Sequence, residues 1–180
     1  VSKWGLFFGS NVSNALVSKN RVHSFDQPGQ SGFNSVGIYF SSATGCTDNQ
    51  IDNNMIDNLN TYGNTSMLLA GIRIVGGSNY KIYYNSISMT GVIGNPLAGM
   101  VSSCIYISTA TTNADIRNNI CLNTRTGLDQ KNYTIHSPNT TTFANLNHND
   151  YWTTGGVIGY FGADVANFTD WKTVVGQDLN

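Results

Sequence analysis

The sequence predicts an all-β fold in which short parallel strands stack coil upon coil around one long apolar core. The main observation is a pattern, apolar-x-x-Asn-x-apolar, that occurs five times at intervals of about 30 to 34 residues. A second pair of apolar residues stands at a matching distance upstream of the first four copies. The third observation is composition, since 24 Asn and 19 Gly favour turns and strands over helix interiors.

The upstream pairs predict the first strand of each coil. In each pair, two apolar residues flank a single residue, and this alternation at a period of two is typical of a strand with one face in the core. The pairs are Leu6 and Phe8, Ile38 and Phe40, Ile72 and Ile74, and Ile105 and Ile107, followed by a weaker fifth pair, Ile135 and Ser137.

The apolar positions on either side of the repeated Asn predict two further strands per coil, with the Asn at the corner between them. Such short strands are not stable alone, so we expect each to pair in parallel with its counterpart in the next coil. Ile51, Ile82 and Ile116 should therefore be vertical neighbours in the core. The apolar pairs are Val17 and Val22, Ile51 and Ile56, Ile82 and Ile87, Ile116 and Cys121, and Leu146 and Tyr151.

The repeated asparagines predict a polar ladder at this corner, formed by Asn20, Asn54, Asn85, Asn119 and Asn149. We expect each to adopt the left-handed backbone conformation that a sharp bend needs, because Asn tolerates it better than branched residues do. The side-chain amides should bond to the coils above and below, which satisfies polar groups inside the core. A second column of Asx residues predicts the preceding corner and consists of Asn14, Asp48, Asn79 and Asn113.

This combination of apolar columns and in-phase asparagines resembles the repeat of the right-handed parallel β-helix, as found in pectate-lyase-like proteins and in large secreted or surface-displayed bacterial proteins. The resemblance covers roughly residues 5 to 152 and implies about five coils, in a repeat domain at residues 1–152. The left-handed β-helix is the main alternative, but its short hexapeptide period is absent. The resemblance leaves the activity open, because such proteins include lyases, hydrolases, epimerases, adhesins and passive stalks.

Residues 153–180 depart from the repeat and are expected to form a capping segment. Residues 157–161 are predicted to form a strand, and residues 167–172 begin a short helix that Asn167 or Thr169 would cap. Trp171 on this helix should cover this end of the core, and Trp4 is the candidate for a comparable part at the other end. We expect the chain to be a processed product or a segment of a longer protein, because it begins without Met and almost at once with a repeat strand.

Charge contributes little to this chain, since all ten acidic residues are Asp and only 11% of residues are charged. The net charge of −1 provides no basic surface, so nucleic acid is not an expected partner. No apolar run approaches the length of a transmembrane helix, so membrane insertion is not expected either.

Three cysteines cannot all pair within one chain. Cys121 falls in the same apolar column as Ile56 and Ile87, so we expect a buried thiol there. Cys46 and Cys104 lie two coils apart, about 10 Å along a stack of parallel strands, which is too far for a disulfide. Free thiols are therefore predicted, and they do not decide the compartment.

The residue between the two members of each upstream pair should point outward and form one column with its counterparts. The column consists of Phe7, Tyr39, Arg73, Tyr106 and His136. Its rings could stack on the sugars of an extended glycan, so Tyr39, Arg73, Tyr106 and His136 are candidate glycan contacts. The alternative, which we favour, is that Tyr39 and Tyr106 sandwich Arg73 through cation–π contacts and shield the sheet.

The sequence contains no recognisable catalytic arrangement. Polysaccharide-cleaving enzymes of the resembled fold need a carboxylate cluster with calcium, or several aspartates that converge on the scissile bond. Asp48, Asp52 and Asp57 share a coil but should lie on different faces, which makes calcium binding the weaker interpretation. Asp52 also shares an outward column with Tyr83 and Arg117, where the charges should pair weakly across two coils. No catalytic residue, metal or other cofactor is predicted, and the histidines lack the spacing of zinc ligands.

These observations favour a non-catalytic extracellular or cell-surface module, a structural stalk, adhesin or surface-display segment that contacts polysaccharide or other surface proteins. The first alternative is a polysaccharide lyase or glycoside hydrolase of the β-helix class, with catalytic loops that are divergent or lie outside this segment. The second is a fibre subunit that associates end to end, because unpaired strand edges invite further pairing.

Overall fold

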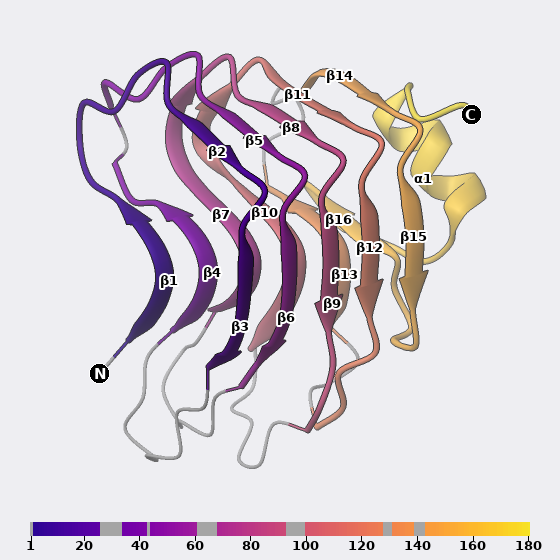
Figure 1. Ribbon diagram of the computed structural model, residues 1–180. Coiled ribbons are helices and arrows are strands. Elements are labelled where there is room, and N and C mark those ends of the chain that lie inside the picture. Colours follow the sequence, from indigo (N-terminus) through magenta and orange to yellow (C-terminus); the bar gives the residue numbers. More distant parts are fainter. Residues whose placement is uncertain are drawn as a thin grey trace.

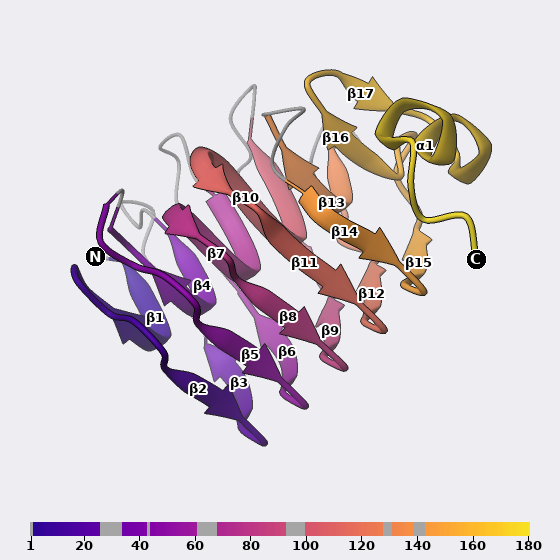
Figure 2. The ribbon, with the colours of Figure 1, turned by 90° about the horizontal axis from the view of Figure 1, so that it is seen from above.

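In the computed structural model, the short strands form three sheets, and strands from successive coils pair in parallel within each sheet (Figure 1). The structure describes residues 2–25, 34–42, 44–60, 68–92, 100–127, 131–138 and 143–180. Each of five coils adds one strand to each sheet. Seen from the N-terminal end, the chain turns clockwise as it runs away from the viewer, which makes the β-helix right-handed (Figures 1 and 2). The predicted all-β, right-handed parallel β-helix is therefore confirmed.

The first strand of every coil belongs to sheet A, the second to sheet B and the third to sheet C. Sheet A contains β1 (Lys3–Phe8), β4 (Ser35–Phe40), β7 (Leu68–Ser78), β10 (Val101–Thr112), β13 (Asn132–Ser137), β16 (Gly159–Phe161) and β17 (Asp164–Val165). Sheet B contains β2 (Leu16–Ser18), β5 (Gln50–Asp52), β8 (Lys81–Tyr83), β11 (Ala114–Arg117) and β14 (Phe143–Asn147). Sheet C contains β3 (Arg21–Phe25), β6 (Met55–Leu59), β9 (Ser86–Met89), β12 (Ile120–Asn123) and β15 (Asp150–Thr153).

Apolar side chains form continuous files along the axis of the solenoid. In sheet B, Ile82 pairs in register with Ile51 on one side and with Ile116 on the other, and all three are fully buried. The corresponding file of sheet A contains Leu6, Ile38, Ile72, Ile105 and Ile135, and that of sheet C contains Val22, Ile56, Ile87, Cys121 and Tyr151. The predicted stacking of like side chains is confirmed in all three sheets.

The asparagine ladder runs without a break through the corner between sheets B and C. The amide nitrogen of Asn85 donates to the Asn119 side-chain oxygen at 3.0 Å and to the Ile51 carbonyl at 2.9 Å, which joins the coils on both sides. The same amide-to-amide bond, at 2.9 to 3.0 Å, connects every successive pair in the series Asn20, Asn54, Asn85, Asn119 and Asn149. The predicted ladder of bonds to neighbouring coils is therefore confirmed.

The expectation that these asparagines carry the left-handed backbone is wrong by one residue. The positive φ angles fall on the residue before each ladder Asn, at Lys19, Asn53, Tyr84, Asn118 and His148. A left-handed residue one step earlier turns the chain so that the following Asn points into the core, while the left-handed residue keeps its own side chain outside. The preceding corner was predicted correctly, since φ is +56 to +58° at Asn14, Asp48, Asn79 and Asn113.

Glycines let sheet A approach sheet C closely. A Cβ atom added to Gly71 would lie 2.4 Å from Ile87 Cγ2 and 2.7 Å from the Cys104 carbonyl oxygen. Gly5 and Gly37 are confined in the same way in the two preceding coils. Each of these positions therefore points into the core beside the apolar file of sheet C, and only hydrogen fits there.

Replacing Gly71 by alanine should lower the free energy of unfolding by about 1–3 kcal/mol, because the added methyl group overlaps a side chain and a backbone carbonyl. Equilibrium urea unfolding measures this change. Gly9→Ala is the control, since no heavy atom lies within 4 Å of the Cβ position there, and it should leave stability unchanged or slightly raised. Equal losses in both variants would refute the close approach of the sheets.

The C-terminal segment closes the last coil, as predicted. The helix α1 (Phe168–Val175) is capped by Asn167, whose side chain accepts a hydrogen bond from the Asp170 backbone at 3.0 Å. It brings Trp171 over the core with 1% of its surface exposed. The Trp171 ring occupies the place of a side chain at Gly159, where a Cβ would lie 2.4 Å from it, and so terminates the isoleucine file of sheet A. The predicted strand is found as β16, paired antiparallel with β17.

Candidate functional site on the outer faces of the sheets

The predicted outward column of sheet A exists and is longer than expected. Register places Phe7, Tyr39, Arg73, Tyr106 and His136 side by side on successive coils. Tyr160 of β16 extends the column by one more residue, because this strand pairs with β13. We call these six residues the aromatic column.

Ring faces within the aromatic column are covered by one another. The ring of His136 lies 4.9 Å from that of Tyr106 and 4.5 Å from that of Tyr160, with interplanar angles of 11 and 12°. These distances match the spacing of adjacent strands, so the rings stack along the axis as the coils do. A sugar that stacks on an aromatic ring needs a free face, and here the faces are turned toward neighbouring rings.

Arg73 lies between two tyrosines of the column. Its guanidinium carbon is 4.9 Å from the centre of the Tyr39 ring and 5.6 Å from that of the Tyr106 ring. The predicted cation–π sandwich is confirmed, and it continues the stack through the one coil that has no ring. All four candidate glycan contacts therefore pack against one another along the column.

Exposed ring surface is found at the N-terminal end of the aromatic column. Trp4 and Phe7 stack at 4.6 Å and are 43 and 48% exposed, and Tyr39 lies against both. The expectation that Trp4 covers the N-terminal end of the core is wrong, because its ring lies on the outer face against Phe7. This cluster offers a broad aromatic surface to solvent.

The C-terminal end of the column is enclosed by tyrosine side chains. Tyr133 packs against both His136 and Tyr160, and its hydroxyl donates to Asp164 at 2.7 Å. Lys131 donates to the same carboxylate, and these bonds lower the pKa of Asp164. Burial in this environment lowers the pKa of His136 to about 4, so its imidazole is neutral at neutral pH.

The depressed pKa of His136 predicts an acid-labile contribution to stability. The unfolded chain takes up a proton on this residue near pH 6.5, whereas the folded protein takes it up near pH 4. Stability should therefore fall by about 2–3 kcal/mol as the pH is lowered through this window. Urea midpoints measured between pH 7 and 4 test this. His136→Phe, which keeps a ring in the stack, should flatten the dependence, and an unchanged slope would contradict the assignment.

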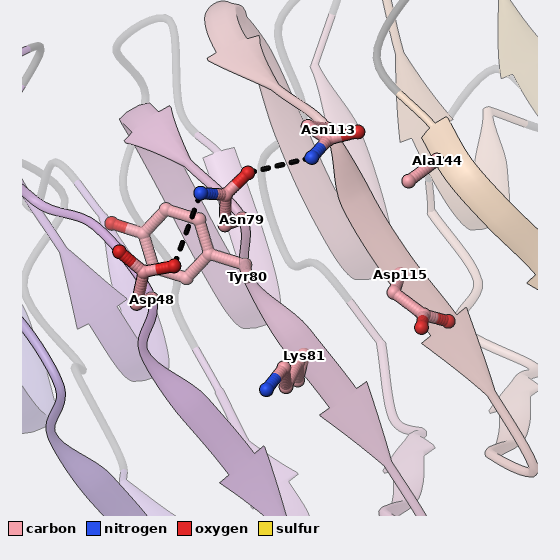
Figure 3. Close-up of a pocket in the computed structure, with 7 residues that line it drawn as sticks. All are labelled: Asp48, Asn79, Tyr80, Lys81, Asn113, Asp115 and Ala144. Carbon is pink, nitrogen blue, oxygen red and sulfur yellow. Dashed lines mark hydrogen bonds between the residues drawn. The ribbon is translucent and has the colours of Figure 1, made fainter.

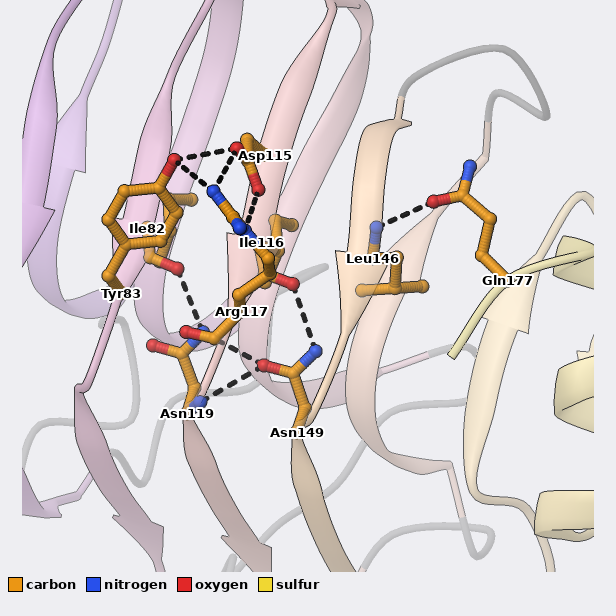
Figure 4. A network of polar contacts seen from close by, with 9 residues as sticks. All are labelled: Ile82, Tyr83, Asp115, Ile116, Arg117, Asn119, Leu146, Asn149 and Gln177. Carbon is orange, nitrogen blue, oxygen red and sulfur yellow. Dashed lines mark hydrogen bonds and ion pairs between the residues drawn. The ribbon is translucent and has the colours of Figure 1, made fainter. Parts of the chain in front are cut away.

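The outer face of sheet B carries a polar network around Arg117 (Figure 4). The Arg117 guanidinium donates to both oxygens of Asp115 at 2.7 and 2.8 Å, and to the Tyr83 hydroxyl at 3.2 Å. That hydroxyl in turn donates to Asp115 at 2.6 Å. The predicted weak pairing of Asp52 with Arg117 is wrong, because Asp115 is nearer, two residues away on the same face of the strand. Asp52 instead accepts hydrogen bonds from Ser18 and Gln50.

A shallow polar hollow of about 380 Å³ lies at the corner between sheets A and B (Figure 3). Asn79 donates to Asp48 at 3.0 Å and accepts from Asn113 at 2.6 Å, so the second Asx column forms a short ladder along its rim. Lys81 and Asp115 approach the hollow from sheet B, and Ala144 leaves it open at the last coil. It therefore presents hydrogen-bonding groups with both signs of charge.

The outer face of sheet C exposes three large apolar side chains, which lie on different coils. Met55, Ile120 and Trp152 are 49, 53 and 63% exposed. Ser86 and Ser88 of the third coil line a groove of about 200 Å³ between Met55 of the second coil and Ile120 and Leu122 of the fourth. The sequence did not predict this apolar surface. The outward positions of sheet C alternate with the buried ones along each strand, and their residue types differ from coil to coil, so they form no repeat.

Potential acidic ligands are dispersed over the coil that contains them. Asp48 lies at the corner ladder, Asp52 on sheet B, and Asp57 on sheet C, where it pairs with Arg21 at 3.5 Å. In the described ranges, no three His, Cys or Asp residues lie close enough together to hold a metal ion. Within the same ranges, no helix combines the length and apolar character that a membrane crossing requires.

No protein-family profile matches this chain, and no curated protein or solved structure matches it.

Proposed function

We propose that the chain is a non-catalytic module of an extracellular or cell-surface protein, in which the β-helix acts as a structural stalk or display segment. The asparagine ladder is the observation that carries this proposal. It fastens every coil to the next through buried side chains as well as through backbone pairing, which favours a stiff rod. The same combination of ladder and three-sheet coil supports kinship with the pectate-lyase-like β-helices of secreted bacterial proteins.

The ionisable side chains support the same proposal, because much of their hydrogen-bonding capacity serves the fold. Asp115 holds Arg117 and Tyr83, and Asp164 holds Lys131 and Tyr133. Asp178 accepts from the Tyr151 hydroxyl and from the Trp171 indole nitrogen, and so fixes the cap. Groups committed to such bonds are costly to redirect toward a substrate.

Turnover assays separate this proposal from the enzyme alternative. The purified chain is incubated with a panel of polysaccharides, with and without calcium, and assayed for new reducing ends and unsaturated products. We expect neither product. Turnover that disappears when a single aspartate is replaced, for example in Asp52→Asn or Asp57→Asn, would overturn the non-catalytic assignment in favour of a polysaccharide lyase or glycoside hydrolase.

Glycan contact is the second function that we propose, and the exposed rings of Trp4 and Phe7 favour it. Aromatic surface of this kind stacks on the apolar faces of sugars. On a glycan array, Trp4→Ala should lose binding that the parent shows, whereas Tyr106→Ala, whose ring lies within the column, should retain it if it folds. Binding that survives Trp4→Ala, Phe7→Ala and Tyr39→Ala alike would exclude this surface.

End-to-end association remains the third candidate. β1, β2 and β3 are the outermost strands of their sheets in the structure, and outermost strands can pair with further strands. Light scattering over a range of concentrations distinguishes the cases. A mass that rises with concentration supports a fibre subunit, whereas a monomer at every concentration argues against it.

A further inference from the structure

The fourth coil differs from the others where sheet A meets sheet C. In the first three coils a glycine of sheet A faces a branched residue of sheet C, as in the pair of Gly71 and Ile87. In the fourth coil, Cys104 occupies the position in sheet A that Gly71 has in the third coil, and Cys121 occupies the position in sheet C that Ile87 has. One glycine and one isoleucine are therefore replaced together by two cysteines that face each other across the core.

The geometry of the preceding coils limits the separation of these two positions. A Cβ on Gly71 would lie 2.4 Å from Ile87 Cγ2, which is itself one bond of about 1.5 Å from Ile87 Cβ. The Cβ positions of residues 71 and 87, which correspond to Cys104 and Cys121 one coil later, are then at most about 3.9 Å apart. Disulfides require a Cβ–Cβ distance of about 3.5–4.5 Å. The pairs Gly5 with Val22 and Gly37 with Ile56 show equally short contacts, of 2.4 and 2.7 Å, so this spacing is a regular property of the solenoid.

The contacts of Cys104 agree with this placement. Its sulfur lies 3.4 Å from the carbonyl oxygen of Leu122, the residue after Cys121, and 3.9 Å from that of Ile87. Burial, reinforced by the neighbouring Cys121 thiol, raises the pKa of Cys104 well above its usual value. All three cysteines are free thiols in the structure, as predicted. Cys104 and Cys121 are almost completely buried, so they react slowly in the folded protein and readily while the chain is still folding.

We propose that Cys104 and Cys121 form an intrachain disulfide when the protein folds under oxidising conditions, and that this bond fastens sheet A to sheet C inside the fourth coil. Cys46 is left as the single thiol, since its sulfur lies in the corner of the second coil, 3.4 Å from the Gly9 carbonyl oxygen. The proposal does not depend on the function of the module.

The oxidant in the test is glutathione disulfide. One cysteine thiolate attacks it, forms a mixed disulfide and releases one glutathione thiolate. The second cysteine thiolate then displaces the other glutathione and closes the Cys104–Cys121 bond. Two protein thiols are thereby oxidised, one glutathione disulfide is reduced to two glutathione molecules, and the two protons from the protein thiols pass to the released thiolates.

Thiol counting tests the bond directly. The protein is unfolded with reductant, refolded in a buffer of reduced and oxidised glutathione, denatured again and alkylated, and its mass is measured. We expect one alkylated cysteine, and three after a second reduction. Trypsin cuts after Arg117, between the two cysteines, so the peptides 82–117 and 118–125 should remain joined in the oxidised sample. Three alkylated cysteines without the second reduction, or a link that involves Cys46, would overturn the proposal.

Thermal unfolding provides a second readout. Closing the loop between residues 104 and 121 restricts the unfolded chain, so reductant should lower the Tm of the oxidised protein by about 5–10 °C. The variant Cys104→Gly/Cys121→Ile restores the pair found in the third coil and should show no response to reductant. Cys46→Ala should respond like the parent. A full response in the Cys104→Gly/Cys121→Ile variant would also contradict the assignment.

Discussion

Asn85→Ala is expected to lower the free energy of unfolding by about 3–6 kcal/mol. The Asn85 side-chain oxygen accepts from both the backbone and the side-chain nitrogen of Asn54, at 3.1 and 2.9 Å. Its amide nitrogen donates to the Ile51 carbonyl. In the Asn85→Ala variant, these three groups lose the hydrogen bond that Asn85 makes to them inside the core. Each unsatisfied group costs about 1–3 kcal/mol.

Asn20→Ala is the matched control for this prediction. Asn20 stands at the first coil, is partly exposed, and donates to Asn54 and to the Ser18 carbonyl. Water can take over the hydrogen bonds of the Asn20 side chain, so the free energy of unfolding should fall by about 1 kcal/mol or less. Urea unfolding followed by circular dichroism compares the two variants. Similar losses would mean that the ladder does not pass through the core as described.

The second large effect is expected from Ile82→Ala, which should cost about 2–5 kcal/mol through lost burial and the cavity left behind. Ile82 is fully buried between Ile51 and Ile116, in the middle of the solenoid, where neighbouring coils on both sides limit relaxation. The same unfolding experiment measures the loss.

Lys81→Ala on the same strand is the control for Ile82→Ala. Its side chain points outward into solvent and should cost under about 0.5 kcal/mol. A loss for Lys81→Ala that equals the loss for Ile82→Ala would contradict the assignment of Ile82 to the inward face and Lys81 to the outward face of β8.

Much of the fold could be predicted from the sequence, because each coil repeats one solution to the same packing problem. Ile51, Ile82 and Ile116 occupy equivalent positions of that repeat, and parallel stacking in register is the arrangement that buries all three. The cap was predictable as well, since the pattern lapses after Tyr151 and Trp171 follows on a segment with a helix-capping Asn.

The conformation of the corners was harder to predict than their position. The left-handed residues include Lys19, Tyr84 and His148, which share no chemical property, whereas the conspicuous Asn is the residue that follows each of them. Only two of the five, Asn53 and Asn118, are asparagines, a residue type that adopts this conformation readily, so the sequence signal is weak. The ladder Asn is conserved from coil to coil because of its hydrogen bonds rather than its backbone angle.

The candidate surface could be predicted only in part. The order of the aromatic column followed from the repeat, but Tyr160 was missed because it lies in the segment where the repeat lapses and joins the column only through strand pairing. The pairing of Cys104 with Cys121 was missed for a similar reason. The two belong to different strands of one coil, and only the closeness of sheets A and C, set by glycines such as Gly71, brings them together.

The central claim is that successive coils place like side chains directly above one another, and methyl NMR tests it most directly. In a protein labelled at isoleucine δ1-methyl groups, nuclear Overhauser cross-peaks should connect Ile51 with Ile82 and Ile82 with Ile116, whose backbones are partners in adjacent strands. Ile51 and Ile116 lie two coils apart and should show a much weaker cross-peak or none. Absence of the two adjacent-coil cross-peaks, with all three methyl groups assigned, would contradict the stacked solenoid.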